Sequence, residues 1–569
     1  MIVNLFNAQQ NLAFSTIDTV KLETRTGGNE LDSVTEYHAG FVVLSPGSFK
    51  NSLFGQYNND YSFSLTRLNS TFIPFQKRNF KFTAAPHLGF MYSFGSKGIQ
   101  MLNVEYQQFF SKKFGMNLSL NRNSMGEMVR EGDFKFSETQ LKSRFLDKRY
   151  KNYLDLSYQK IIKHHNGGLD TAQSVLEFPL TFLKARKTNA FDSIQQFKIQ
   201  TEHYLNFLDD SIRGFGLNLN QKLSISNRVY REEDSLQKIY SKINLDSLKT
   251  RDQFQFAKVS NELGVYVSNK NLNFTFNFLH AYWRFQNLAQ NQDTVELALS
   301  SALQFKIGKI NLRNQFYFNL SGAKGEKYNN LIVSYKHAKF DLNGFLNFSQ
   351  KLPDLWQRSY FANNYSWKLT NLKLQTNTSV GGEFSFKMKQ DLKAGMSYTN
   401  LKNNYFFVDS VWRNDTLNQL SLLSLNVRTS LKYKFLLFQP SIILNQFSSD
   451  LSHLPKLDFR SRLAINKKVF KSQKLDFILG VDFTYQSARK LIAYNNALDL
   501  LVLTNSSEKT NPNQYKFDVF TGIQVETFRF YIKAENLNYI WDKSDSYIYQ
   551  GIPITPFYLR IGLTWDFFN

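Results

Sequence analysis

Adjacent histidines are the first feature of this sequence that could carry chemistry, because histidine is both a common catalytic base and a common metal ligand. His164 and His165 stand in the segment KHHNGG, where they could form a metal-binding or catalytic pair. No further histidine or carboxylate follows at the spacing of a zinc site. The two glycines that end the segment are typical of a turn. We therefore interpret the histidine pair as part of a solvated loop between strands.

Other patterns of catalysis and cofactor binding are also missing from the sequence. We find no nucleophile motif, ATP site, metal site or proton relay. Cysteine is absent, which excludes disulfides and thiolate metal ligands. A serine–histidine site assembled only in the fold stays open, because serine is common throughout the chain. The sequence thus predicts a protein that is not an enzyme and has no catalytic, cofactor-binding or metal-binding residues.

The third kind of chemistry is the attraction of anions by basic side chains. The formal net charge of +23 suggests acidic surroundings, namely nucleic acid, lipopolysaccharide or an anionic solute. Nucleic acid is the weakest of these, because the lysines and arginines are scattered and form no patch or tail. Some of them alternate with apolar residues in extended segments: Arg313, Arg428, Lys432, Arg529, Lys533 and Arg560.

The elements that hold these basic residues are predicted β-strands, and the clearest is the stretch 555–569, TPFYLRIGLTWDFFN. Successive side chains of a strand point to opposite sides, so this stretch is apolar on one side and polar on the other. A long apolar strand is an exposed, adhesive edge unless another strand covers it. We therefore expect it to close a barrel against the first strand. The apolar side would carry Phe557, Leu559, Ile561, Leu563, Trp565 and Phe567.

Composition extends this prediction to the whole chain. Aromatic residues make up 16% of the sequence, yet the mean hydropathy is −0.38. No run approaches the ~18–20 apolar residues of a spanning helix. Lipid-facing strands resolve the conflict, because only every second residue must be apolar. About 18 to 22 alternating segments of ~10–14 residues follow one another, which predicts an all-β fold: a transmembrane antiparallel up-and-down β-barrel.

The links between the segments are of two kinds. Two-residue links such as Gly308-Lys309 indicate hairpins. Longer polar links alternate with the short ones, as expected for a barrel with short turns at one rim and long loops at the other. The long links predicted from the sequence are residues 163–193, 231–252, 351–371, 400–418 and 487–513.

We predict a single barrel domain over residues 35–569, preceded by a polar lead-in over residues 1–34. The lead-in starts with MIVNLFNAQQ, which we interpret as the remnant of a signal peptide. Asp18-Thr19-Val20 is similar to the energy-coupling segment of gated outer-membrane receptors, but the lead-in has no room for their plug domain. A large soluble β protein, such as a propeller, is the alternative fold. Propellers repeat every ~40–50 residues, and we find no such repeat.

Within a barrel, the basic residues listed above must face the lumen. A charge on the lipid side would cost ~2–4 kcal/mol at mid-depth. We therefore predict Arg313, Arg428, Lys432, Arg529, Lys533 and Arg560 to be pore-lining, with the strands of the last three adjacent. Carboxylates on the same side could pair with them and cancel their field. The tryptophans are predicted to form aromatic girdles at the bilayer interfaces: Trp283, Trp356, Trp367, Trp412, Trp541 and Trp565.

Three segments carry a resemblance to a known family: PDLWQRSYFANNYSWK (Pro353–Lys368), the predicted strand FYIKAENLNYI (Phe530–Ile540) and the terminal RIGLTWDFF. Together they resemble the putative porin family of large outer-membrane barrels from Bacteroidota, in which a Tyr…Asn-x-x-Trp segment precedes a strand. The last strand also resembles the assembly signal of outer-membrane barrels, with Trp565, Phe567 and Phe568 as its aromatic residues. The resemblance implies a Gram-negative outer membrane and, as partners, its lipid, lipopolysaccharide and the barrel-assembly machinery.

The function that follows is a porin-like channel for passive diffusion of small polar solutes, as a monomer or a homo-oligomer. A lumen lined by amides, hydroxyls and charges carries water, and an excess of basic residues would make it weakly anion-selective. The alternative is a non-conducting barrel that serves as a structural or partner-binding component of an envelope assembly, with its lumen closed by loops.

Overall fold

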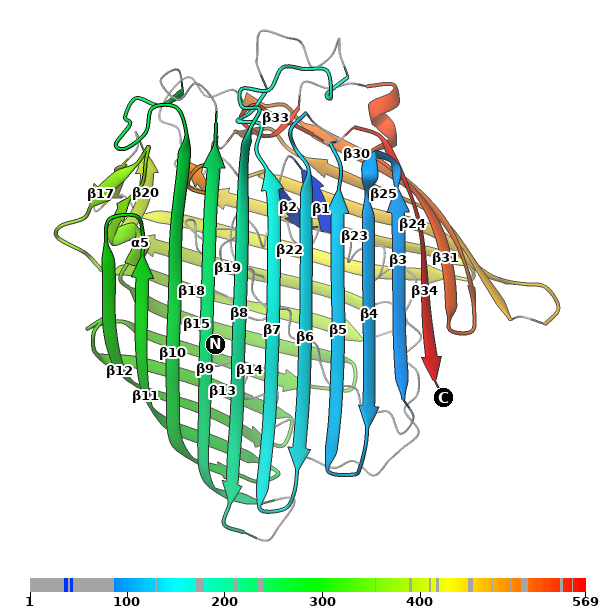
Figure 1. The fold of residues 1–569 in the computed structure, drawn as a ribbon. Coiled ribbons are helices and arrows are strands. Elements are labelled where there is room, and N and C mark those ends of the chain that lie inside the picture. The colour runs from blue at the N-terminus through cyan, green and yellow to red at the C-terminus, as the bar shows by residue number, and fades with distance from the viewer. Residues whose placement is uncertain are drawn as a thin grey trace.

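The computed structural model describes residues 35–38, 41–44 and 86–568, apart from 128–129, 170–178, 209–212, 234–238, 354, 388–390, 409–410, 416–418, 449–453, 473, 492, 503–509, 543–545 and 555. Within this part, the chain forms a closed antiparallel barrel of 22 strands (Figure 1). The structure therefore confirms the predicted all-β barrel, at the upper end of the predicted range of strand number.

The barrel strands follow the chain in order. The first half of the ring is β3 (His87–Gly95), β4 (Gln100–Phe109), β5 (Phe114–Met125), β6 (Phe134–Leu146), β7 (Tyr150–His164), β8 (Ala190–Asn206), β9 (Gly214–Glu232), β10 (Thr250–Ser268), β11 (Leu272–Gln286), β12 (Asn291–Ile307) and β13 (Ile310–Ser321). The second half is β14 (Lys327–Lys336), β15 (Phe340–Lys351), β18 (Gln375–Lys387), β19 (Asp391–Lys402), β22 (Leu420–Tyr433), β23 (Leu436–Phe447), β24 (Leu457–Val469), β25 (Leu475–Gln486), β30 (Gln514–Val525), β31 (Phe528–Glu535) and β34 (Tyr558–Phe568).

The last strand closes the ring, as the sequence predicted. β34 pairs with β31 on one side and with β3 on the other, in a register that runs from Gly95 opposite Arg560 to His87 opposite Phe568. Because a strand pairs with β34 on each side, neither of its edges is left exposed.

Alternation along the strands sorts side chains between the two surfaces of the wall. In β34, Leu559 and Trp565 are 46% and 42% exposed, whereas Arg560 and Thr564 are 1% and 4% exposed. The same alternation runs through the other strands, so the outer surface is apolar and the lumen side is polar. No helix in the described residues is long and apolar enough to cross a membrane.

The two rims differ as the sequence predicted. Short turns join the strands at one rim, and Gly308-Lys309 links Ile307 to its partner Ile310. Long loops lie at the other rim, over residues 165–189, 233–249, 352–374, 403–419, 487–513 and 536–557. The first five correspond to the long links predicted from the sequence.

The sixth long loop, residues 536–557, corrects a prediction. The segment FYIKAENLNYI is not one strand, because β31 ends at Glu535. Asn536 then adopts a left-handed conformation with φ 54°, and the 3₁₀ helix η3 (Leu537–Ile540) follows. Asparagine tolerates this conformation, and the Asn536 N–H donates a hydrogen bond to the buried Asp518 carboxylate at 2.7 Å.

The ring begins with β3. β1 (Thr35–His38) and β2 (Phe41–Leu44) pair with each other in a separate two-stranded sheet. The lead-in over residues 1–34, with its Asp18-Thr19-Val20 segment, lies outside the described residues. Several strands also exceed the predicted length, up to 19 residues in β9 and β10.

Candidate functional site

The basic residues predicted near the C-terminus lie on the lumen side and are neighbours, as expected. Lys533 in β31 stands directly opposite Arg560 in β34. They do not face open water, however, because they are only 6% and 1% exposed. The Lys533 ammonium lies 3.2 Å from the Asp518 carboxylate and 3.3 Å from Asp482. These charges are therefore balanced within the wall, which is the pairing that would cancel a positive field.

The Arg560 guanidinium is paired in the same way. It forms an ion pair with the Glu535 carboxylate, which also accepts a hydrogen bond from the Tyr558 hydroxyl at 2.7 Å. All three side chains are buried. Arg560 thus holds β31 and β34 together at the seam of the barrel.

The other predicted lumen residues lie closer to the short-turn rim and are more accessible. Arg428 is exposed and lies 3.2 Å from the Glu383 carboxylate. Lys432, also exposed, has no ion pair within the described residues. Arg529 donates hydrogen bonds to the Gln524 side-chain oxygen at 3.0 and 3.1 Å, and Arg313 is partly buried.

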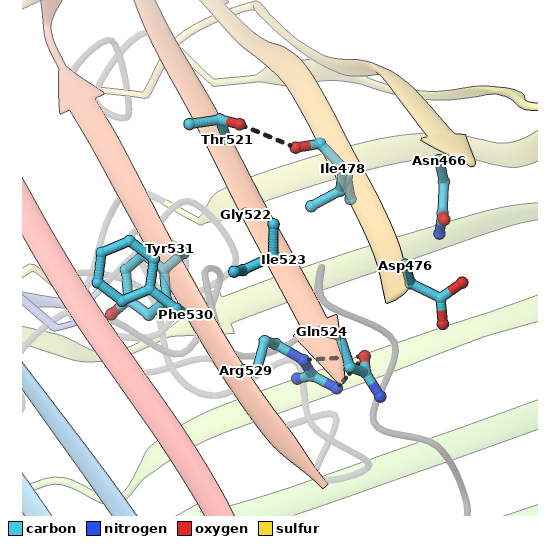
Figure 2. Close-up of a pocket in the computed structure, with 10 residues that line it drawn as sticks. All are labelled: Asn466, Asp476, Ile478, Thr521, Gly522, Ile523, Gln524, Arg529, Phe530 and Tyr531. Carbon is cyan, nitrogen blue, oxygen red and sulfur yellow. Dashed lines mark hydrogen bonds between the residues drawn. The ribbon is translucent and has the colours of Figure 1, made fainter. Parts of the chain in front are cut away.

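A small pocket lies beside Arg529 on the lumen side of β24, β25, β30 and β31 (Figure 2). Asn466, Asp476, Gln524 and Arg529 contribute its polar groups. Its volume is about 30 Å³.

The long loops pack on one another, and we call their described parts the loop cap: residues 165–189, 233–249, 352–374, 403–419, 487–513 and 536–557. The cap contains an aromatic cluster. Trp367 stacks on Tyr360 with ring centroids 4.7 Å apart, and Trp412 lies 5.3 Å from Trp356 and 5.4 Å from Phe407. These five side chains are buried although they come from loops.

The aromatic cluster is assembled from three loops and one part of the wall. The segment 352–374 supplies the short helix α5 (Leu355–Arg358) and the hairpin of β16 (Ser359–Phe361) and β17 (Ser366–Lys368). The next loop supplies the hairpin of β20 (Asn404–Val408) and β21 (Val411–Asp415). Leu498 comes from loop 487–513, and Phe254 and Phe285 come from β10 and β11.

Hydrogen bonds between loops add to this packing. The Asn363 side-chain amide donates to the Asp246 carbonyl at 2.8 Å, and the Asn363 N–H donates to the Asp252 carboxylate at 2.8 Å. The Asn495 amide donates to the Tyr365 hydroxyl at 2.7 Å. Loop 352–374 is thus bound both to loop 233–249 and to loop 487–513.

Loop 487–513 leaves β25 but is anchored at a distant part of the wall. The carboxylate of Asp499 pairs with Lys163, and Arg228 donates to the Asn496 carbonyl at 3.1 Å. Lys163 lies in β7 and Arg228 in β9. The loop enters the wall again at β30. Even along the shorter path around the ring, six strands lie between β30 and β7, namely β31, β34, β3, β4, β5 and β6. The loop therefore passes across the mouth of the barrel.

The contacts at this anchor are buried and charge-balanced. Arg228 binds the Asp192 carboxylate with two hydrogen bonds of 2.7 and 2.8 Å, and the His165 ring lies 2.9 Å from the same carboxylate. Each of these side chains, like Lys163 and Asp499, is at most 1% exposed. We call the five residues the anchor cluster. Removing one partner of such a buried pair leaves a charge without compensation, at a cost of about 3–5 kcal/mol.

The anchor cluster corrects the interpretation of the histidine pair. His164 is half-buried and forms an ion pair with Asp133 at 2.6 Å, but His165 is buried and is not part of a solvated loop. Burial lowers the pKa of the His165 imidazole, while its hydrogen bond to Asp192 opposes the shift. No group of three histidines, aspartates or glutamates that could hold a metal occurs within the described residues.

The prediction of tryptophan girdles is largely wrong. Trp356, Trp367 and Trp412 are buried in the loop cap, and Trp283 lies on the lumen side, where it donates a hydrogen bond to Glu296 at 2.7 Å. Trp541 and Trp565 are exposed. Spacing near strand ends could not separate the two locations, because girdles and cap loops both lie at the rims.

The aromatic residues of the predicted assembly signal lie at the rim of short turns. Trp565 and Phe567 face outward and are 42% and 37% exposed, with ring centroids 4.2 Å apart. Phe568 is the last residue of β34 and pairs with His87.

The family comparison agrees with this architecture. The family model described as a putative porin matches residues 47–569 of the chain. A search of curated proteins finds no match.

Solved structures match the barrel closely in shape and weakly in sequence. The siderophore receptor PirA from Acinetobacter baumannii aligns with a TM-score of 0.61 and 12% identity, over 86% of this chain and 81% of that one. The copper transporter OprC aligns with a TM-score of 0.65 and 8% identity, over 86% of this chain and 82% of that one. The ferric-catecholate import receptor Fiu from E. coli K12 aligns with a TM-score of 0.60 and 10% identity, over 85% of this chain and 82% of that one. At this identity the likeness shows an outer-membrane type of barrel fold.

Proposed function

Because the chain belongs to the putative porin family, we propose that it is an outer-membrane channel for the passive diffusion of small polar solutes, narrowed at one mouth by the loop cap. We place it in the outer membrane of a Gram-negative bacterium, with the long loops outside and the short turns in the periplasm. It performs no catalysis in this proposal and needs no cofactor. The barrel-assembly machinery inserts it through its last strand.

The observation that carries the proposal is the closed wall with two different surfaces. Its outer surface is apolar and suits lipid, and its lumen side carries amides, hydroxyls and charges. Barrels of 16 to 18 strands already enclose an aqueous channel. A ring of 22 strands is wider, and within the described residues the loop cap narrows one of its mouths.

The charges on the lumen side support a weak preference for anions. Towards the short-turn rim, the strands from β12 to β31 direct more basic than acidic side chains inward. The acidic ones are Asp341, Glu383 and Asp476, and the basic ones are Lys306, Arg313, Lys336, Lys393, Arg428, Lys432, Lys468 and Arg529. A positive field at this opening raises the local concentration of anions and reaches ~8 Å at physiological salt.

Liposome swelling with solutes of graded size tests the proposal. Proteoliposomes should swell in small sugars and amino acids and should exclude larger oligosaccharides, because the cap narrows one mouth. Liposomes that carry the heat-unfolded protein serve as the control. Swelling no faster than this control, for every solute, would overturn the channel.

The loop cap favours a second candidate, a non-conducting barrel that binds a partner. Its aromatic core is buried and its anchor is charge-balanced, as expected of a stable closure. In that case the parent protein would show no conductance, while the cap surface would retain a partner from the envelope.

A further inference from the structure

The charged residues on the outer surface of β5–β10 are all basic and gather near one rim. On these strands the outward positions alternate with buried lumen positions, so they can be read from the register. None of them is an aspartate or a glutamate. Five are arginines or lysines, all on the side of the long loops: Arg122, Lys135, Lys160, Arg231 and Arg251.

Three of these residues surround one serine. In the register, Ser137 of β6 lies opposite Arg122 of β5 on one side and opposite Lys160 of β7 on the other. Lys135 comes two residues before Ser137 in β6 and therefore points to the same surface. Since neighbouring strands are ~4.8 Å apart, the three cations start from points within about 10 Å of each other. We call the three cations, Arg122, Lys135 and Lys160, together with the Ser137 that they surround, the basic triangle.

The side chains of the basic triangle are available for a ligand. Arg122 and Lys135 are exposed, and Lys160 is partly exposed. None of the three cations has an ion pair within the described residues. Asp133, just before β6, is paired with His164 at 2.6 Å and also feels the charge of Lys135, so it compensates Lys135 only in part. Three cations without an ion pair of their own on one surface call for an anion.

The height of the triangle on the wall indicates which anion. Below it, towards the short turns, the next outward positions are Leu120 of β5, Thr139 of β6 and Tyr158 of β7, followed by Leu118, Leu141 and Leu156. The triangle thus lies where the apolar band ends on the side of the long loops. At this depth a lipid-facing cation meets head groups rather than acyl chains.

We propose that the basic triangle binds a phosphate group of the glycolipid of the outer leaflet, with the acyl chains lying along the apolar rows below it. Arginine, lysine and a serine hydroxyl supply the charged and neutral donors that a phosphate accepts. A phosphorylated glycolipid fits better than a protein partner, because its acyl chains and its anionic head group match the two halves of this surface. The inference rests on the proposed orientation in the membrane, and it does not depend on conductance.

Native mass spectrometry of the purified, detergent-solubilised full chain tests the proposal. The probes are lipid A with both phosphates, lipid A without phosphates, and phosphatidylglycerol, each titrated into protein freed of bound lipid. We expect the parent to prefer lipid A with both phosphates by at least tenfold over the other two. In the triple variant Arg122→Gln, Lys135→Gln and Lys160→Gln, the affinity for lipid A with both phosphates should fall by tenfold to about a hundredfold and the preference should be lost, since one basic residue at an anionic surface is worth ~1 kcal/mol, or about fivefold in affinity.

A matched control removes the same number of charges at the opposite rim. Lys467 faces outward near the end of β24, and Lys471 and Lys474 are exposed in the turn that follows. Changing these three lysines to glutamine should leave the preference for phosphorylated lipid A unchanged. Equal loss in the two triple variants would overturn the site, as would equal binding of lipid A with and without phosphates. A preference of the parent for phosphatidylglycerol would overturn the assignment to the outer leaflet.

Discussion

Asp499 and Lys163 are 336 positions apart in the chain, yet they share one buried ion pair that fixes loop 487–513 across the mouth of the barrel. The Asp192 carboxylate is already paired with Arg228. If Asp499 is lost, Asp192 can therefore balance the charge of Lys163 only in part. This residue-scale contact therefore decides how firmly the cap is closed. It could not be predicted from the sequence, since nothing in the local pattern links an aspartate in a loop to a lysine in β7.

We expect Asp499→Asn to loosen the cap without unfolding the barrel. The loss of the buried pair should weaken docking of the loop by up to about 3–5 kcal/mol. Limited proteolysis should then cut loop 487–513 faster, and larger solutes should enter proteoliposomes. The matched control is Asp293→Asn, which breaks the exposed pair of Asp293 with Arg284, a surface ion pair that contributes little to stability. Identical proteolysis and permeation in the two variants would contradict the anchor.

Selectivity is also decided by single residues, and the structure shifts the emphasis among them. Lys533 and Arg560 are balanced by buried carboxylates, so the exposed Lys432 and the accessible Arg529 carry more of the proposed field. The parent should show a weak anion preference that fades as salt rises. Lys432→Ser should reduce it, and so should Arg529→Ser.

Reversal potentials under a salt gradient measure this preference. Lys467→Ser is the control, because it removes the same charge from the outer surface. A cation preference in the parent, or no change in either lumen variant, would remove these residues as a selectivity element.

At the scale of elements, the last strand shows how far alternation alone can predict structure. Its two surfaces, its pairing with the first strand of the ring and its position beside β31 follow from the order of apolar and polar residues. Prediction fails where the pattern is the same for two structures. FYIKAENLNYI continues to alternate beyond Glu535, but Asn536 takes a left-handed conformation and ends the extended chain.

The cap hairpins are a second element that the sequence could not resolve. The segment Pro353–Lys368 was distinctive by its resemblance, but an aromatic loop residue and an aromatic girdle residue look alike in sequence. Only the folded loops bring Trp356, Trp367 and Trp412 into one buried cluster. Its physical basis is the mutual burial of rings from loops that are remote along the chain.

For the last strand we predict an effect on assembly rather than on selectivity. Replacing Phe567 and Phe568 with serine should block insertion, because these residues lie at the end that closes the ring and serve as the recognition signal. Heat-modifiable gel migration of outer-membrane fractions measures the folded form. As a control, Tyr433→Ser with Phe470→Ser removes two aromatic residues that are 71% and 75% exposed near the same rim. Normal amounts of folded terminal variant would show that another segment carries the signal.

At the scale of the whole molecule, a wide polar lumen and a packed cap act against each other. The 22-strand ring would pass large solutes if it were open, and the cap reduces this passage. The all-β class, the strand range and the arrangement of rims were predictable, because they depend on periodicity and segment length, and the family was predictable from the resemblance of three segments. The closure was not, because it depends on contacts between loops.

Single-channel recording of the purified protein in planar bilayers tests the central claim most directly. We predict discrete conductance steps for the parent, smaller than those of an unobstructed barrel of this width, and larger steps for Asp499→Asn. The absence of any step from the parent and from Asp499→Asn, under conditions where heat-modifiable migration shows both to be folded, would contradict the channel.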